Sequence, residues 1–157
     1  MSAQALQIIE AMKLRAQQIV SGGGSPFFTS AGQQVFIGRT QFHLESDTFP
    51  LITFGVPRTT AVPINVKTQT YTITADYVAV GYIAVPVDEY AANPIALQAD
   101  MQLALMRAAP GDLLLPLVED YRWIGSSIDY PQDTTDFTRV SVQLRATWTE
   151  TLGASFP

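Results

Sequence analysis

The sequence predicts an α+β fold in which two main helices pack on one face of a mixed, mostly antiparallel sheet. Apolar residues recur at helical spacing over residues 3–20 and 94–109, whereas polar and apolar residues alternate over 67–85 and 137–152. The chain therefore runs from a helix through several strands to a second helix and two further strands, an order that is typical of α+β proteins. A length of 157 residues predicts one domain spanning residues 1–157.

The first predicted helix, residues 3–20, ends at a glycine-rich segment. The sequence "SGGGSP" contains three glycines and a proline, which favour a flexible exit from the helix, so we expect residues 22–34 to form a flexible loop. A phosphate-binding loop would require a lysine and a Ser or Thr after the glycines at set spacing, and these are absent. The apolar stripe of this helix is predicted to contain Leu6, Ile9, Met12, Ala16, Ile19 and Val20.

Residues 27–66 have mixed patterns. The segments "QQVFIGRTQF" and "PLITFGVPR" each resemble a short strand. Residues 57–66 contain Pro57 and Pro63, which exclude a central strand, so they are predicted to form a loop or an edge strand.

Two longer strands are predicted from strict alternation. In residues 67–85, Tyr71 to Ala79 alternate with polar residues before the segment becomes almost entirely apolar around Gly81, where we expect a bulge or bend. A short apolar segment interrupted by Pro116 and a further strand near residues 119–129 follow later in the chain. The last strand, residues 137–152, is predicted to have one face exposed to solvent. Its core face is predicted to contain Val140, Val142, Leu144, Ala146 and Trp148.

The second predicted helix has two apolar stripes. Asn93 can cap it, Pro94 occupies its first position, and Gly111 follows its end. One stripe, with Leu97, Met101, Ala104, Leu105 and Ala108, is predicted to face the sheet. The other is a candidate helix–helix or subunit interface; the first helix is the favoured partner and a neighbouring subunit is the alternative. This second stripe contains Ile95, Ala99, Leu103 and Met106.

The composition excludes several classes of function. Charged residues make up only 15% of the chain, the net charge is −5, and no basic run is present, which argues against specific nucleic-acid binding. The absence of cysteine excludes disulfides and thiolate sites. The N-terminus lacks the pattern of a signal peptide, and no apolar run approaches the ~20 residues that span a membrane, so we expect a soluble protein without membrane partners.

Few residues suggest catalysis. His43 is the only histidine and lies near Glu45 and Asp47, but a solvated polar loop is the favoured interpretation. Carboxylate pairs at 88–89 and 119–120 flank the ends of predicted elements, where acidic residues are common. The sequence also lacks a Gly-x-Ser-x-Gly elbow and a Gly-x-Gly-x-x-Gly fingerprint. We therefore predict no catalytic residues, cofactor or metal; a small hydrolase or ligand-binding protein using His43 and nearby acids is the alternative from another class.

Two stretches together suggest a family. The first is "VFIGRTQFHLESDTFPLITFGVP", residues 35–57, and the second is the block from Tyr82 to Trp148, with its apolar strand, helix and two strands. Their order of predicted elements, their length and their local sequence resemble those of the tail terminator, or tail completion, proteins of long-tailed bacteriophages. The resemblance begins near residue 5 and covers most of the chain, but it contains no strict signature motif.

This resemblance implies a structural protein rather than an enzyme. Tail terminators form a hexameric ring that caps the tail tube, ends its polymerisation and provides a surface for head joining. The expected partners are other copies of the chain, the tail tube protein and the head–tail connector protein, with DNA passing through the bore without specific binding. The expected location is the head-proximal end of the virion tail after assembly in the host cytoplasm. A neighbouring head–tail connector or tube-like tail subunit is the alternative within the same machine.

Overall fold

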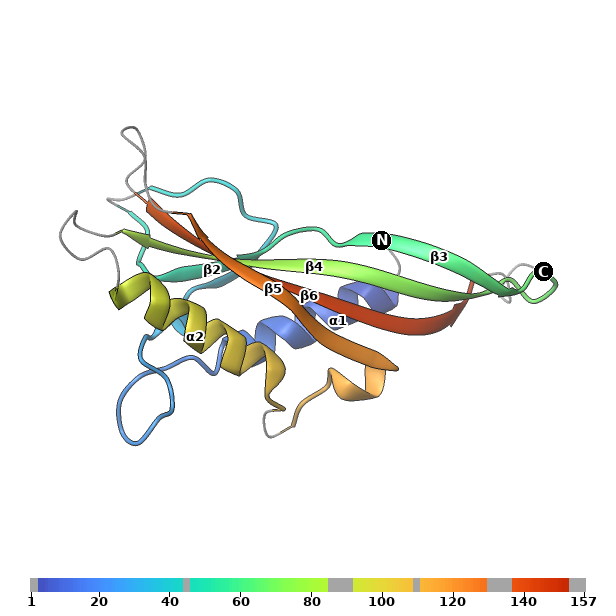
Figure 1. Ribbon diagram of the computed structural model, residues 1–157, viewed down its shortest axis with the longest axis horizontal. Coiled ribbons are helices and arrows are strands. Elements are labelled where there is room, and N and C mark those ends of the chain that lie inside the picture. The colour runs from blue at the N-terminus through green and yellow to red at the C-terminus, as the bar shows by residue number, and fades with distance from the viewer. Residues whose placement is uncertain (1–2, 44–45, 85–91, 109–110, 130–136, 153–157) are drawn as a thin grey trace.

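A computed structural model describes residues 3–43, 46–84, 92–108, 111–129 and 137–152 and confirms the predicted α+β class (Figure 1). Its elements follow one another in the expected order of helix, strands, helix and strands. They are α1 (Ala3–Ala16), the 3₁₀ helix η1 (Ala31–Gln33), β1 (Val35–Ile37), β2 (Leu51–Phe54), β3 (Arg58–Asn65), β4 (Thr70–Ala84), α2 (Ala92–Met106), the 3₁₀ helix η2 (Leu115–Leu117), β5 (Asp120–Asp129) and β6 (Phe137–Thr151).

The described strands form one six-stranded sheet with the order β1-β2-β4-β6-β5. Only β1 and β2 pair in parallel, and the other pairings are antiparallel. One edge of β4 pairs along its whole length with β6. The opposite edge is shared, because β2 pairs with residues 79–82 and β3 with residues 70–76. The long β4–β6 pair is therefore the centre of the sheet.

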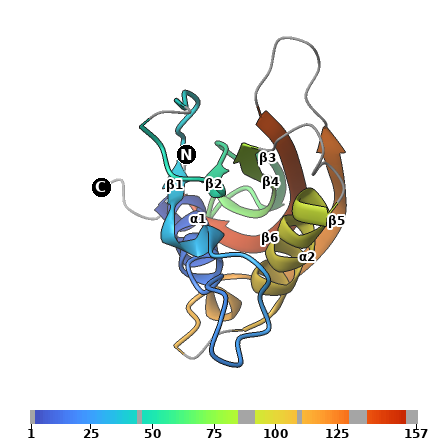
Figure 2. The ribbon, with the colours of Figure 1, turned by 90° about the vertical axis from the view of Figure 1, so that its left-hand side faces the viewer.

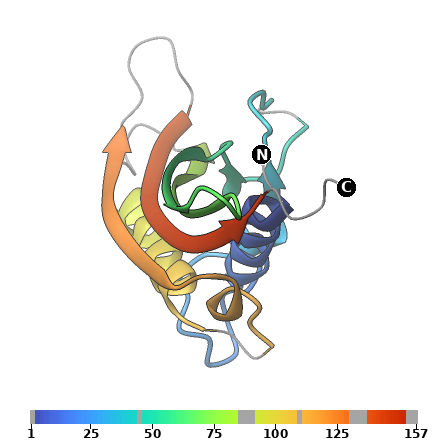
Figure 3. The same cartoon turned by 90° about the vertical axis from the view of Figure 1, so that its right-hand side faces the viewer.

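Both helices lie on the same side of the curled sheet, as Figures 2 and 3 show from its two ends. Helix α1 packs against β1, β2 and α2, and α2 in turn packs against β4, β5 and β6. The core lies between these two layers, and the predicted inward face of β6 is confirmed, since every member is at most 1% exposed. This face contains Val140, Val142, Leu144, Ala146 and Trp148.

Helix α1 is shorter than predicted and is rotated relative to the predicted stripe. It ends at Ala16, and Leu6 and Val20, which were expected in the core, are 41% and 40% exposed. Gly32 packs against the end of this helix, and its amide donates to the Ile19 carbonyl oxygen at 2.8 Å. A Cβ at position 32 would lie 2.7 Å from the carbonyl oxygens of Ala16, Gln17 and Ile19, so only glycine fits there. The buried stripe of α1 contains Ala5, Ile8, Ile9, Ala11, Met12, Arg15 and Ala16.

Gly81 does not mark the bulge that was one of the two predictions for it. This residue lies in uninterrupted register between Ile52 of β2 and Val140 of β6. A Cβ there would lie 2.6 Å from Leu97 Cδ2 and 2.8 Å from Met101 Sδ. Gly81 therefore allows α2 to approach the sheet closely, which is the other common reason for a glycine inside a strand.

Strand β3 forms the edge predicted for residues 57–66. All eight of its residues are exposed, and its pairing with β4 shifts register between Pro63 and Asn65. The β3–β4 hairpin extends beyond the helical layer at one end of the molecule (Figure 1). The sheet is therefore covered by helices over only part of its length.

Candidate functional site

The second apolar stripe of α2 remains on the surface of the folded chain. Ile95, Leu103 and Met106 are 53%, 39% and 42% exposed, and Ala99 is also exposed. The expectation that α1 buries these four residues is therefore wrong: α1 contacts α2 as well as β1 and β2, but it leaves this stripe exposed. We call this surface the outer α2 stripe. As an interface with a neighbouring subunit, it stays a prediction.

The two flanks of α2 are occupied by polar contacts that orient the outer stripe. On one flank, Asp100 is 1% exposed and accepts hydrogen bonds from the backbone amides of Phe28 (3.0 Å) and Thr29 (2.7 Å). On the other flank, Gln102 Nε2 donates to Ser126 Oγ on β5 at 2.8 Å. Sequence reasoning did not identify Asp100 as a buried, hydrogen-bonded residue. The available signal was its position between the two apolar stripes of the helix.

A buried ion pair links the end of α1 to the segment that follows α2. Arg15 is 2% exposed, and its Nε and Nη2 atoms donate to both carboxylate oxygens of Asp112 at 2.7 and 3.0 Å. Its Nη1 donates to the Leu105 carbonyl oxygen at 2.7 Å, and its guanidinium carbon lies 5.5 Å from the Tyr121 ring centroid. The hydrogen bonds from Arg15 hold the pKa of Asp112 below its ordinary value, whereas burial raises the pKa of Tyr121. These contacts make the cluster a structural clamp.

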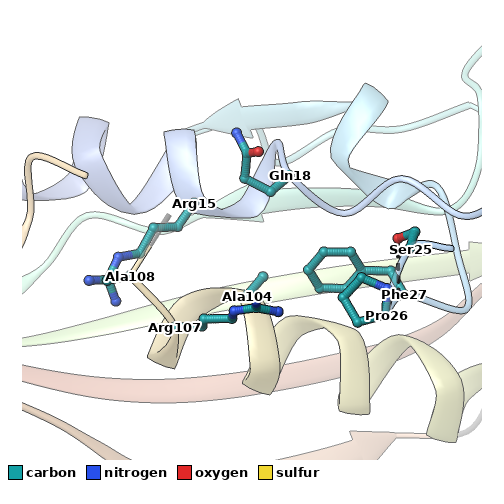
Figure 4. A pocket seen from close by; sticks show the side chains of 8 residues that line it. All are labelled: Arg15, Gln18, Ser25, Pro26, Phe27, Ala104, Arg107 and Ala108. Carbon is teal, nitrogen blue, oxygen red and sulfur yellow. Dashed lines mark hydrogen bonds between the residues drawn. The ribbon is translucent and has the colours of Figure 1, made fainter. Parts of the chain in front are cut away.

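A small open pocket lies beside this clamp (Figure 4). Its volume is about 230 Å³. Two cations line it, but the guanidinium of Arg15 is already bound by Asp112, which leaves Arg107 as the cation without an ion pair among the described side chains. The pocket therefore combines one available positive charge with an apolar wall. Its lining contains Arg15, Gln18, Ser25, Pro26, Phe27, Ala104, Arg107 and Ala108.

The structure does not assemble the predicted His43 cluster into a catalytic group. The backbone amide of His43, not its exposed imidazole, donates to Asp47 Oδ2 at 2.6 Å. Arg39 Nη2 donates to the other oxygen of the same carboxylate at 2.5 Å. The His43 amide and then Arg39 lower the pKa of Asp47, and this carboxylate links Arg39 to His43 between β1 and β2. Glu45 lies outside the described residues.

The carboxylate pairs do not form an acid–base pair in the described part of the chain. Asp88 and Glu89 lie outside the described residues. Asp120 accepts a hydrogen bond from Arg122 Nε at 2.8 Å, while Glu119 is exposed and its backbone amide continues the pairing with β6. Within the described ranges, no group of three or more His, Cys, Asp or Glu side chains could hold a metal ion.

Comparison with known proteins found no matching family model and no matching curated protein. None of the helices in the described part of the chain has both the length and the apolar character needed to cross a membrane. The outer α2 stripe is an exposed apolar region of the described surface whose apolar character is predicted from the sequence.

Proposed function

We propose that this protein is a structural assembly protein of a bacteriophage tail, a ring-forming tail terminator without catalytic activity. In this role it caps the tail tube, ends tube polymerisation and provides the surface for head joining. It acts at the head-proximal end of the virion tail after assembly in the host cytoplasm. The resemblance of residues 35–57 and 82–148 to tail terminators supports the specific role.

The observation that carries the proposal is the exposure of the outer α2 stripe. A surface helix normally presents one apolar face to its own core and polar residues to water. Here Ile95, Ala99, Leu103 and Met106 remain exposed although the opposite face of α2 is already buried. Contiguous exposed apolar residues are typical of protein–protein interfaces. Contact with a neighbouring copy would remove this stripe from water.

Charge supports the same assignment. The chain has a net charge of −5, and its nine Lys and Arg residues are scattered along the sequence. Basic side chains bind DNA phosphates strongly, so a ring through which DNA passes benefits from a low density of them in its bore. The expected partners are further copies of this chain, the tail tube protein and the head–tail connector protein.

The test is the mass of the purified protein in solution, alone and mixed with its tail tube protein, combined with negative-stain imaging. We expect hexameric rings that bind the ends of tubes and stop their growth. Binding along the length of tubes, or incorporation into them, would instead favour a tube-like subunit. Binding only to the head side would favour a connector. A protein that remains monomeric under all these conditions would contradict the proposal.

A further inference from the structure

The β3 strand and the turn after it form a second unpartnered surface, which we call the arm (residues 58–67). Val62, Ile64 and Val66 are 64%, 60% and 68% exposed. Eight strand residues at ~3.3 Å each span roughly 26 Å, which allows an edge strand to reach well beyond the body of a subunit. Figure 1 shows this hairpin extending past the helical layer. Nothing in the described chain covers its aliphatic side chains.

The arm is poorly suited to bind a partner by extending the sheet. Pro63 has no amide hydrogen, and the register with β4 shifts between Pro63 and Asn65. Proline and bulges on an edge strand hinder pairing with a further strand. The arm therefore presents its side chains, rather than its backbone, to a partner.

A groove on the helical side offers a matching apolar surface. It lies between α1 and the segment around η2, has a volume of about 400 Å³, and contains the exposed side chains of Leu14 (49%) and Leu113 (59%). Gln4 Nε2 donates to the Leu117 carbonyl oxygen at 2.7 Å, which fixes η2 against α1 and so holds the groove open. The groove is lined by Gln7, Glu10, Ala11, Leu14, Leu113, Pro116 and Leu117.

The charges of the two surfaces are opposite. Glu10 is the one charged residue of the groove lining, and Lys67 is exposed at the tip of the arm, directly after Val66. Neither side chain has an ion pair within the described ranges. Opposite charges beside apolar patches steer two surfaces together and set their register.

We propose that the arm of one copy of this chain docks in the α1–η2 groove of a second copy. In this contact the aliphatic side chains of the arm cover Leu14 and Leu113, and Lys67 pairs with Glu10 across the interface. Because arm and groove are different surfaces, the contact is heterologous, and heterologous contacts generate rings when their rotation closes. The inference rests on the proposed ring function and specifies which surfaces would build the ring.

Charge exchange tests this pairing. Lys67→Glu and Glu10→Lys each place like charges together at every arm–groove contact, so each variant alone should assemble only at concentrations at least about tenfold higher than the wild type. An equimolar mixture of the two variants restores opposite charges at each contact of an alternating ring. The mixture, and the double variant K67E/E10K, should therefore assemble near the wild-type concentration. Sedimentation velocity measures the concentration at which the wild type, each single variant, the mixture and the double variant assemble.

Two controls separate assembly from folding. Lys67 and Glu10 are both exposed, so each single variant should keep the wild-type melting temperature measured at a concentration where all samples are monomeric. Arg139→Glu makes the same charge change at the end of β6 that pairs with Asp129, at the other end of β5 from η2 and outside the part of the sheet that pairs with the arm, and it should assemble like the wild type. Ile64→Ser removes apolar contact without changing charge and should weaken assembly in the wild type and in the double variant.

The outcomes distinguish the inference from the proposed function. If the wild type forms rings and both single variants assemble equally well, the arm–groove contact is wrong while the proposed function stands. Failure of the mixture and of the double variant to recover assembly would also overturn the contact. A wild-type protein that forms no ring, even with the tail tube protein, would overturn both.

Discussion

At the scale of single residues, two charged groups that are buried in the described part of the chain have partners of different kinds. Arg15 is bound by a carboxylate, a carbonyl oxygen and an aromatic ring, whereas Asp100 is bound by backbone amides. Both side chains are at least 98% buried. A buried charge is tolerated only when it is paired and hydrogen-bonded. Removing one partner of a buried charge therefore lowers the free energy of unfolding more than removing one partner of an exposed ion pair.

Asp112→Asn tests the buried ion pair. It removes the negative charge that compensates Arg15, and we expect the free energy of unfolding to fall by about 3 kcal/mol. Asp120→Asn is the matched control, because Asp120 pairs with Arg122 at an exposed position and should cost less than about 1 kcal/mol. Urea denaturation measures both variants. Equal losses would mean that the Arg15 pair behaves as a surface pair.

The same pair predicts a pH dependence with a defined sign. The pKa of Asp112 is lowered from 3.8 by folding, so the unfolded state binds a proton at higher pH than the folded state. The stability from this carboxylate is complete above about pH 5 and is lost as pH falls below 3.8 through the lowered folded value. The stability difference between wild type and Asp112→Asn should therefore narrow in acid. A difference that stays constant down to pH 2 would contradict this explanation.

Gly32 tests a steric constraint. Gly32→Ala places a Cβ 2.7 Å from the carbonyl oxygens of Ala16, Gln17 and Ile19, and these backbone atoms cannot rotate away. We expect a loss of about 3 kcal/mol, at the upper end for overpacking. Gly125→Ala, in the β5 bulge, meets nothing within 4 Å and should change stability by less than about 0.5 kcal/mol. Thermal unfolding of both variants compares them, and a neutral Gly32→Ala would mean that η1 can move.

At the scale of elements, β4 and β6 determine the architecture because they pair along their whole length. Their inward faces carry the largest buried side chains of the sheet, including Tyr77 and Trp148, and both helices pack onto this side. Their outward faces are mainly polar and include the Asp76–Arg145 pair, in which Arg145 Nε donates at 2.7 Å. Alternation along these two strands therefore decides which face of the sheet receives the helices.

Leu144→Ala tests the assignment of faces on β6. Leu144 is completely buried, so its truncation should cost about 2–5 kcal/mol, the range observed for leucines in protein cores. Gln143→Ala is the control on the exposed face of the same strand and should cost less than about 0.5 kcal/mol. Chemical denaturation gives both values. A cost for Leu144→Ala as small as that of the control would mean that the faces are inverted.

At the scale of the whole molecule, helices cover only part of the sheet, and the described residues leave apolar surface at several places. These include the outer α2 stripe, the arm and the α1–η2 groove. Their separation on the molecule fits a subunit with neighbours on more than one side. A low fraction of charged residues, 15%, is consistent with a surface of which much is covered after assembly.

Ala99→Glu tests the outer α2 stripe as a subunit interface. Ala99 is exposed at the middle of the stripe, and glutamate is a good helix former, so the melting temperature of the monomer should stay unchanged. If a neighbouring copy covers the stripe, the new charge is buried without a partner and the ring should dissociate. Ser127→Glu, at an exposed position of β5, is the control and should leave assembly intact. Light scattering reports the mass of each variant, and normal assembly of Ala99→Glu would exclude the stripe from the interface.

The sequence by itself determined the α+β class, the long strands with their buried faces, and the edge position of residues 57–66. These properties depend on periodicity and on proline, which act through residues close together in the chain. It also identified the outer α2 stripe as apolar, but not what would cover it.

Only the tertiary structure decided the contacts between distant parts of the chain. The Arg15–Asp112 bond joins residues 97 positions apart, and the Asp100 bond to the Phe28 amide joins residues 72 positions apart. The same is true of the close approach of α2 at Gly81 and of the placement of α1 over β1 and β2. Local periodicity predicts that a helix has an apolar face to bury. Which element covers that face depends on the path of the whole chain. That path placed α1 away from the outer stripe and left the stripe exposed.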